Sequence, residues 1–231
     1  RLIKLISCFL LVSSSLSVML LMSRAAIIAL FLVFISIILL SVFANKKKYY
    51  FANGLLILSL SISIFSYNLI NEKNAYNIIG ERFSNVTNPT VDGSVNERLN
   101  FYTTSVQSII ENPLLGIGFG NWKIKSIDLS KDIISSYRVP YFVHNDFLQI
   151  TAETGIIGGL CFIFFIMFPF WISFKRTIKH KLFNLDFMIF LIFLVYIIDS
   201  MLNFPFERPI NLIYLFFTIV LFYQSEKYYL K

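Results

Sequence analysis

Charge, cysteine and histidine are all scarce in this 231-residue sequence. Asp, Glu, Lys and Arg together make up only 14% of it, whereas 57% is hydrophobic and 26 residues are Phe. A soluble domain of this length cannot bury so much apolar surface, so the composition excludes that class. The two cysteines, Cys8 and Cys161, lie in separate apolar stretches. That placement excludes a disulfide framework and predicts thiols packed inside the protein.

Long apolar stretches take the place of the missing charge. Six of them are long enough, or nearly so, to cross a bilayer core that needs about 20 helical residues. They cover residues 2–22, 25–44, 49–70, 156–174, 182–202 and 210–223. We therefore predict an all-α polytopic membrane protein with about six transmembrane helices. Because the chain opens at Arg1 with a span already under way, we expect it to be the C-terminal part of a longer single membrane domain.

The distribution of charge predicts the topology. One side of the predicted membrane receives eleven basic and two acidic residues, a net charge of +9, and the other receives nine basic and eleven acidic, a net charge of −2. Because cytoplasmic loops are enriched in Lys and Arg, the loop 71–154 is expected outside, between helices in 1–70 and helices in 155–231. The overall charge of +7 then reports topology and contact with anionic lipid, and gives no support for nucleic-acid binding.

The loop contains two patterned segments after a polar stretch, 71–96, that is expected to be flexible. Apolar residues recur at helical spacing from Leu99 to Ile110 and predict an amphipathic helix. Arg98 stands at the start of this helix. It either binds an anion or is a solvated surface residue. Gly116 and Gly118 then alternate with apolar residues. We favour a tight turn whose backbone approaches the membrane or a partner helix, with a substrate-lining turn as the alternative.

His144 is one of only two histidines, and it stands where the loop returns to a helical pattern. We predict a short helix capped by Asn145 or Asp146 and ended by Gly155, so that His144 lies at a helix N-terminus and its pKa is lowered. Glu153 is nine residues further on and faces the opposite side of an ideal helix. It is therefore not expected to be the direct partner of His144.

Four segments together resemble the O-antigen ligase and polymerase family of bacterial envelope proteins. They are SRAA around Arg24, Arg98 ahead of an aromatic helix, PLLGIGFGNW, and HNDFLQITAETGIIG, and they span about residues 23–158. The resemblance implies a helix bundle with a large periplasmic loop in the bacterial inner membrane. It also implies that arginines bind the diphosphate of a lipid carrier, at Arg24, Arg98 and, as a weaker match, Arg82. In the same way it implies that His144 is the catalytic base, and Glu153 matches an acidic position of unspecified role.

Asp199 and the two tryptophans are the remaining residues with a predicted role. Asp199 lies near the outer end of the fifth predicted span, where it is either functional or an interfacial carboxylate paired with Arg208 or Arg24. Trp122 and Trp171 are predicted to be anchors at the membrane interface. No D-x-D pair occurs in the loop, so we expect a mechanism without a metal, and no cofactor.

The resulting functional prediction is glycan transfer from an undecaprenyl-diphosphate-linked donor to an acceptor sugar. We favour a metal-independent inverting O-antigen ligase, acting on lipid A core in lipopolysaccharide biosynthesis. An O-antigen or capsular polysaccharide polymerase, whose acceptor is a lipid-linked glycan, is the alternative. A membrane transporter is a more distant one, because the predicted spans lack the broken helices of that class.

Overall fold

The computed structural model describes residues 2–20, 23–43, 53–54, 57–65, 93–129, 141–180 and 184–229. Its labelled helices are α1 Leu2–Leu20, α2 Arg24–Phe43, α5 Gly93–Glu111, α6 Trp122–Leu129, α7 Asp146–His180, α8 Leu185–Leu202, the 3-10 turn η1 Pro205–Glu207, and α9 Pro209–Tyr229. No strand occurs in this part of the chain, so the predicted all-α class is confirmed. Helix α5 begins at Gly93, inside the stretch predicted to be flexible, and ends ahead of Pro113 as predicted.

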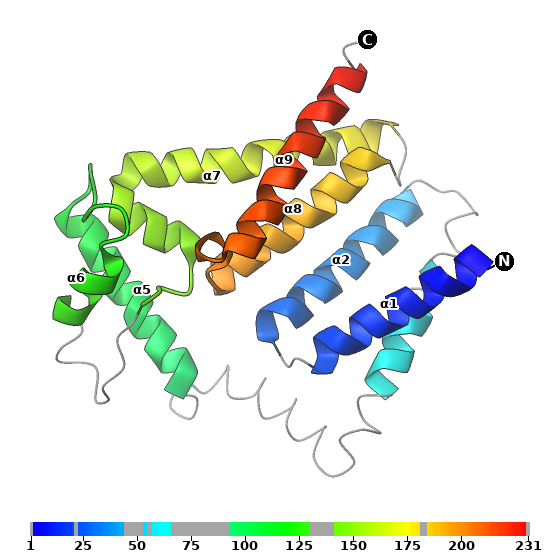
Figure 1. Ribbon diagram of the computed structural model, residues 1–231, viewed down its shortest axis with the longest axis horizontal. Helices are drawn as coiled ribbons and strands as arrows, with labels where there is room; N and C mark the ends of the chain where they lie inside the picture. The colour runs from blue at the N-terminus through cyan, green and yellow to red at the C-terminus, as the bar shows by residue number, and fades with distance from the viewer. Residues whose placement is uncertain are drawn as a thin grey trace.

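Helix α8 lies at the centre of the bundle, where α2, α7 and α9 pack against it (Figure 1). The core between α7, α8 and α9 is formed by large apolar side chains, among them Phe162, Ile166, Ile189, Phe193 and Leu215. Because lipid tails are as apolar as these side chains, close van der Waals packing rather than removal from water stabilises the contact between the helices. The end of the bundle where α2 begins, α8 ends and α9 begins is called the loop end below.

Three helical stretches are long and apolar enough to cross a membrane: Ala25–Val42, Asp146–Lys179 and Leu185–Leu202. Two shorter apolar helices, Phe9–Val18 and Pro209–Ser225, accompany them in the described part of the chain. Many of their large apolar side chains point outward, as lipid requires, with Phe164 66% and Phe217 61% exposed. The protein is thus an all-helical membrane protein, and the figure of six spans stays a prediction.

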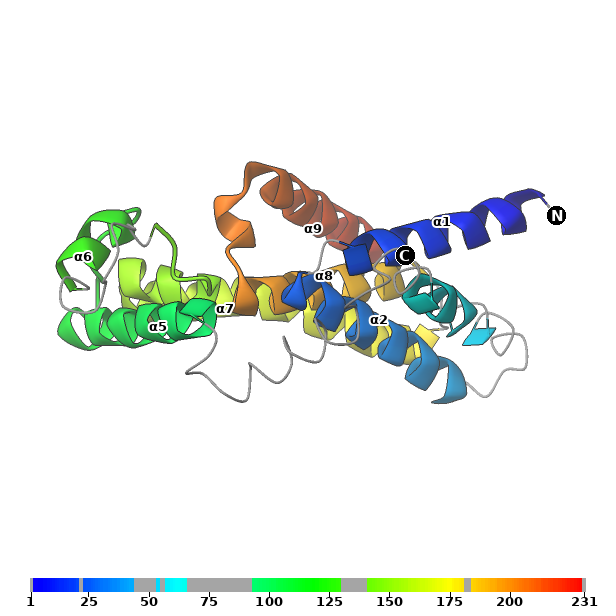
Figure 2. The same cartoon turned by 90° about the horizontal axis from the view of Figure 1, so that it is seen from below.

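Helix α7 is two helices joined at Gly155, whose backbone (φ 74°, ψ 178°) is not helical. Figure 1 shows the short first part meeting the long second part at a sharp bend. Because that backbone region is open essentially to glycine alone, the predicted stop of the short helix at Gly155 is confirmed. Helices α5 and α6 gather around the first part, away from the apolar helices (Figure 2).

Two predictions about single side chains were wrong. Trp122 is not an interface anchor, because it is fully buried in a small core with Val143 and Ala152. Cys161 is exposed on the outer side of α7 rather than packed inside. The pattern of apolar residues could not separate these cases, because a side chain facing lipid and one facing protein are equally apolar.

Candidate functional site

His144 is held in an unusual backbone conformation just before α7. Its φ of 61° is the only positive value among the described residues other than glycine. Left-handed backbone is uncommon outside glycine and tends to persist where the surrounding structure enforces it. Asn145 follows as the helix cap, since its Oδ1 accepts a hydrogen bond from Leu148 N–H at 3.1 Å. The predicted cap is therefore Asn145, and its visible role is to start the helix.

Aromatic side chains from two distant segments enclose the imidazole. Tyr102 of α5 donates its hydroxyl hydrogen to the His144 carbonyl at 3.1 Å. The ring of Phe101 is parallel to the imidazole with centroids 6.4 Å apart, and Phe204, after α8, meets it edge-on at 4.9 Å. Nδ1 of His144 is buried and has no hydrogen-bond partner in the described protein. A buried polar atom without a partner is costly, and here it leaves a ring nitrogen free of hydrogen bonds to the described residues.

The environment lowers the pKa of His144 to about 4. Burial is the largest cause, followed by the positive charges of Arg98 and Arg208. The direction agrees with the sequence-based prediction, but that prediction attributed it to the helix N-terminus. At neutral pH the imidazole is therefore uncharged and able to accept a proton.

Arg98 reaches across from α5 to the loop end of α8. Its Nη1 donates a hydrogen bond to the carbonyl of Leu202, the last residue of α8, at 3.1 Å. The final carbonyls of a helix have no partner within the helix and carry partial negative charge, so a guanidinium stabilises them. Arg98 is thus a half-buried cation that joins two elements near His144, and not a solvated surface residue. Guanidinium has five N–H donors in all, so this contact leaves others for an anion.

Arg208 is the second cation near His144, and the sequence offered little to find it. It directly follows η1, and its guanidinium lies over the Phe204 ring, 4.6 Å from the centroid. From the sequence, Arg208 is an ionisable group in the turn after the fifth predicted span and one of two partners named for Asp199. His144 and Arg208 are 64 residues apart in the sequence with no periodic relation, so only the folded chain shows that they lie close together.

Asp199 does not pair with Arg208 in the described structure. Its Oδ1 accepts a hydrogen bond from the Asn203 side-chain amide at 2.7 Å, one turn further along the end of α8. The predicted pairing with Arg208 is therefore wrong. The pairing with Arg24 stays a prediction, because the Arg24 side chain lies outside the described residues.

The glycine-rich turn packs against the first part of α7. Gly116 and Gly118 both have positive φ, 66° and 95°. Backbone hydrogen bonds join the turn to the helix, from Ile117 N–H to Ala152 O at 3.0 Å and from Gly118 N–H to Glu153 O at 2.9 Å. A Cβ added at Gly116 would lie only 2.4 Å from the Glu153 carbonyl carbon. The favoured prediction, a close approach of backbone to a partner helix, is confirmed.

Glu153 has a structural role that the sequence did not specify. Its buried carboxylate accepts hydrogen bonds from Gly120 N–H at 2.9 Å and from Trp122 N–H at 3.2 Å. The side chain therefore fixes the end of the glycine turn and the start of α6. As predicted, Glu153 does not contact His144 and is not its orienting partner.

The other two arginines predicted to bind a diphosphate can be placed only in part. Helix α2 begins at Arg24, and Ser23 ahead of it accepts a backbone hydrogen bond from Ile27 N–H at 3.0 Å. The start of α2 lies beside the end of α8 in both ribbon views (Figures 1 and 2). Arg82 lies outside the described residues, so its predicted role stays a prediction.

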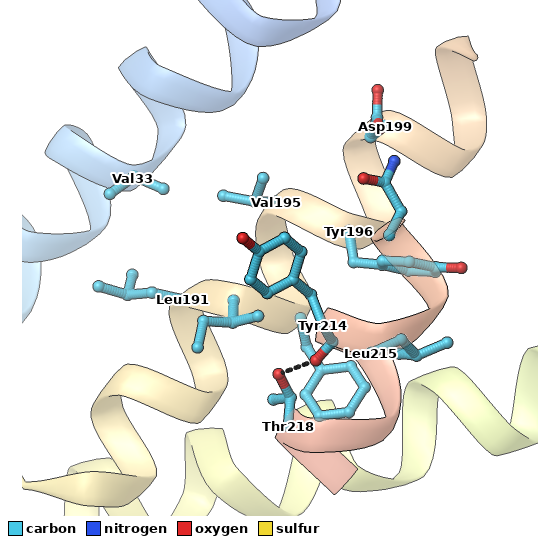
Figure 3. A pocket seen from close by; sticks show the side chains of 11 residues that line it. Val33, Leu191, Val195, Tyr196, Asp199, Tyr214, Leu215 and Thr218 are labelled. Carbon is cyan, nitrogen blue, oxygen red and sulfur yellow. Dashed lines mark hydrogen bonds between the residues drawn. The ribbon is translucent and has the colours of Figure 1, made fainter. Parts of the chain in front are cut away.

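An apolar groove of about 350 Å³ runs along the membrane-facing side of α2, α8 and α9. Figure 3 shows Val33 of α2, Leu191 and Val195 of α8, and Leu215 of α9 among the side chains that line it. Asp199 stands at one end, on the part of α8 that leads to the loop end. Two of the helices that form the groove, α8 and α9, are joined by the turn that carries Arg208.

The fold and the site define a membrane protein whose polar chemistry is concentrated at one end of an apolar bundle. Among the described side chains, no group of three or more His, Cys, Asp or Glu is placed to hold a metal ion. A family model described as O-antigen ligase matches residues 9–163, which is more than half of the sequence. The chain therefore belongs to the O-antigen ligase family of bacterial membrane proteins. No curated protein and no solved structure matches it.

The family match confirms the resemblance and narrows the function to an enzyme of the ligase or polymerase type. It includes Arg24, Arg98 and His144 and ends within the second part of α7. The turn that carries Arg208 therefore lies outside the matched region. The transporter alternative is set aside in favour of the enzyme.

Proposed function

We propose that this protein transfers a glycan from an undecaprenyl-diphosphate carrier to an acceptor sugar at the periplasmic face of the inner membrane. The observation that carries the proposal is the loop-end site, in which a neutral, strained histidine lies within the field of two arginines. A base and an anion-binding group side by side are what displacement of a diphosphate by a hydroxyl requires.

The proposed reaction is a single displacement. The acceptor hydroxyl oxygen attacks the anomeric carbon and forms the new glycosidic bond, while its proton passes to His144. The bond between that carbon and the carrier oxygen breaks, and the diphosphate leaves with the electron pair. Arg98 binds the charge that develops there, because guanidinium donates two parallel hydrogen bonds to phosphate oxygens and is always protonated. Because the hydroxyl oxygen attacks from the side opposite the leaving diphosphate, the configuration at the anomeric carbon is inverted.

The apolar groove on α2, α8 and α9 supports a lipid-linked donor. A carrier whose diphosphate lies at the loop end must pass its prenyl chain sideways into the bilayer, and a groove open to lipid accommodates such a chain. We propose that the chain lies along Val195 and Tyr214, with the diphosphate beyond Asp199. The absence of a D-x-D pair from the loop sequence supports a reaction without a divalent metal.

We favour ligation of O antigen to lipid A core over polymerisation, because the segment around His144 is the part that best matches the ligase pattern. Surface polysaccharide from a deletion strain separates the two on a gel. Loss of a ligase leaves long chains on the carrier, whereas loss of a polymerase leaves lipid A core that bears one repeat. Complementation with the wild-type gene restores the normal ladder in either case.

His144→Asn is the most informative variant in that strain. Asparagine tolerates left-handed backbone, so the substitution removes the base with little added strain. His180→Asn, at the far end of α7, is the matched control because it changes the only other histidine. We expect the control to restore the ladder and His144→Asn to fail at normal protein levels. A full ladder from His144→Asn would overturn the catalytic assignment.

A further inference from the structure

We propose that Arg208 is a further diphosphate-binding residue, which acts together with Arg98 near His144 and is positioned by Gln149. The inference rests on the proposed function, since it assigns a ligand to the same site. Sequence analysis predicted arginines at three other positions for this role.

Phe204 links the imidazole to the Arg208 guanidinium. Its ring meets His144 edge-on at 4.9 Å and lies under the guanidinium at 4.6 Å. Phe142, two residues before His144, stacks on the same ring with centroids 4.2 Å apart and an interplanar angle of 13°. The ring is thus fixed from the His144 segment, and the guanidinium that lies over it has a defined place beside the base.

Gln149 ties the two segments together from inside the protein. This side chain is 3% exposed. Its Oε1 accepts a hydrogen bond from Val143 N–H at 3.0 Å, and its Nε2 donates to Glu207 Oε1 at 3.0 Å. Val143 directly precedes His144 and Glu207 directly precedes Arg208. One buried amide therefore sets the spacing between the base and the second guanidinium.

Asp146 supplies a second link between the same two segments. Its Oδ2 accepts a hydrogen bond from Phe206 N–H at 2.9 Å, and its side chain is buried. The turn that carries Arg208 is therefore attached to the start of α7 at two points. These two buried contacts hold the turn in one position relative to the segment of His144.

The charges near the site favour an anion with two charged groups. Within the described residues, neither Arg98 nor Arg208 forms an ion pair with a carboxylate. The nearby carboxylates accept hydrogen bonds from amides instead, Glu207 from Gln149 and Asp199 from Asn203. Two guanidinium groups that repel each other near one neutral ring are stabilised by a ligand that offers an anionic group to each. A diphosphate has two such groups, and a monophosphate has one.

The test measures binding of undecaprenyl diphosphate and undecaprenyl monophosphate to the full chain in phospholipid vesicles. We expect Arg208→Gln to weaken diphosphate binding about ten- to a hundredfold, the range for loss of a charge-assisted hydrogen bond. Monophosphate binding should change only a few-fold. Lys175→Gln is the matched control, because Lys175 also lies over an aromatic ring, Trp171 at 5.1 Å, at the opposite end of the bundle. It should leave both affinities unchanged.

A double-mutant cycle tests the role of Gln149. If Gln149 acts through Arg208, Gln149→Leu should weaken diphosphate binding in the wild-type background and have little further effect when added to Arg208→Gln. A merely structural role would give additive losses for both ligands. Arg208→Lys keeps the charge and loses the fork of donors, so it should show an intermediate loss and gives the answer if Arg208→Gln does not fold.

The outcomes separate this inference from the function on which it rests. If the wild-type protein binds neither lipid, the proposed function fails and the inference fails with it. If the wild-type protein prefers diphosphate and both Arg208 variants bind it equally well, only the role of Arg208 is overturned. Equal losses for diphosphate and monophosphate would also overturn it, because they would show a general effect of charge.

Discussion

The contact between the glycine turn and the bend of α7 predicts a graded effect of adding one methyl group. A Cβ at Gly116 would lie 2.4 Å from the Glu153 carbonyl carbon, and a Cβ at Gly155 would lie 2.1 Å from the Leu114 carbonyl oxygen. Ordinary carbon–oxygen contacts begin near 3.3 Å, so the two backbones must separate by about 1 Å. Because backbone cannot rotate aside as a side chain can, the hydrogen bonds across the contact are lost.

The magnitude follows from the conformation and those bonds. Placing alanine at a positive φ costs about 1–2 kcal/mol. Three hydrogen bonds cross the contact: Ile117 N–H to Ala152 O, Gly118 N–H to Glu153 O, and Ile156 N–H to Pro113 O at 2.8 Å. Each contributes about 0.5–1.5 kcal/mol net. We therefore expect Gly116→Ala and Gly155→Ala to destabilise the packing of the glycine turn on the first part of α7 by about 3–6 kcal/mol.

Two other glycines separate the conformational cost from the steric one. Gly120 has a φ of 77° with no atom within 4 Å of an added Cβ, so Gly120→Ala should lose only about 1–2 kcal/mol. Gly54 is helical with open space around it, and Gly54→Ala should be neutral or stabilising by about 0.5–1 kcal/mol. The order of the four variants is therefore fixed before any measurement.

Trp122 reports the result directly, because it is fully buried next to the turn and the only other tryptophan is Trp171. In a Trp171→Phe background, thermal unfolding in detergent is followed by the red shift of Trp122 emission. We expect the midpoints of Gly116→Ala and Gly155→Ala to lie well below that of Gly120→Ala. Equal midpoints for Gly116→Ala and Gly120→Ala would refute the close approach.

Three further predictions concern the base, the turn and the groove. Because burial and two arginines lower the pKa of His144 to about 4, transfer should be constant from pH 8 to about 5 and fall as the imidazole is protonated near pH 4; a fall centred near 6.5 would contradict this. In Arg208→Gln the fall should move to higher pH, because one positive charge no longer opposes protonation. Glu153→Gln should destabilise the loop by about 1–3 kcal/mol by the same emission assay, since an amide has only one acceptor oxygen for the two N–H groups; an unchanged midpoint would contradict it. Val195→Trp, at a groove position that is 40% exposed, should fill the groove and raise the KM for a long-chain prenyl donor more than for a short-chain one, and equal changes would exclude the groove as the chain site.

The site illustrates how far sequence reasoning reached. Asn145, Gly155 and the helix from Leu99 onward were predictable, because capping, left-handed backbone and helical spacing are properties of neighbouring residues. That the backbone at Gly116 approaches a helix closely was also predictable, but which helix it approaches was not. The partner is the first part of α7, more than thirty residues further on, and no local pattern encodes that distance.

The errors have the same origin. Trp122 was taken for a membrane anchor because indole suits both an interface and a core, and only packing distinguishes the two. For Asp199 the sequence allows a functional carboxylate or one paired with Arg208 or Arg24. In the structure this carboxylate accepts a hydrogen bond from the side-chain amide of Asn203, one helical turn further along. Arg98, thought to be either free for an anion or solvated, also stabilises the end of α8.

The sequence by itself determined that the chain is an all-α membrane protein and that His144 lies just before a short helix that ends at Gly155. These follow from composition and from short-range periodicity, which the bilayer and the helix translate directly into structure. Only the tertiary structure decided what surrounds His144. Tyr102, Arg98 and Arg208 reach it from α5 and from the turn after α8, because packing of α7 against both brings these segments to one end of the bundle.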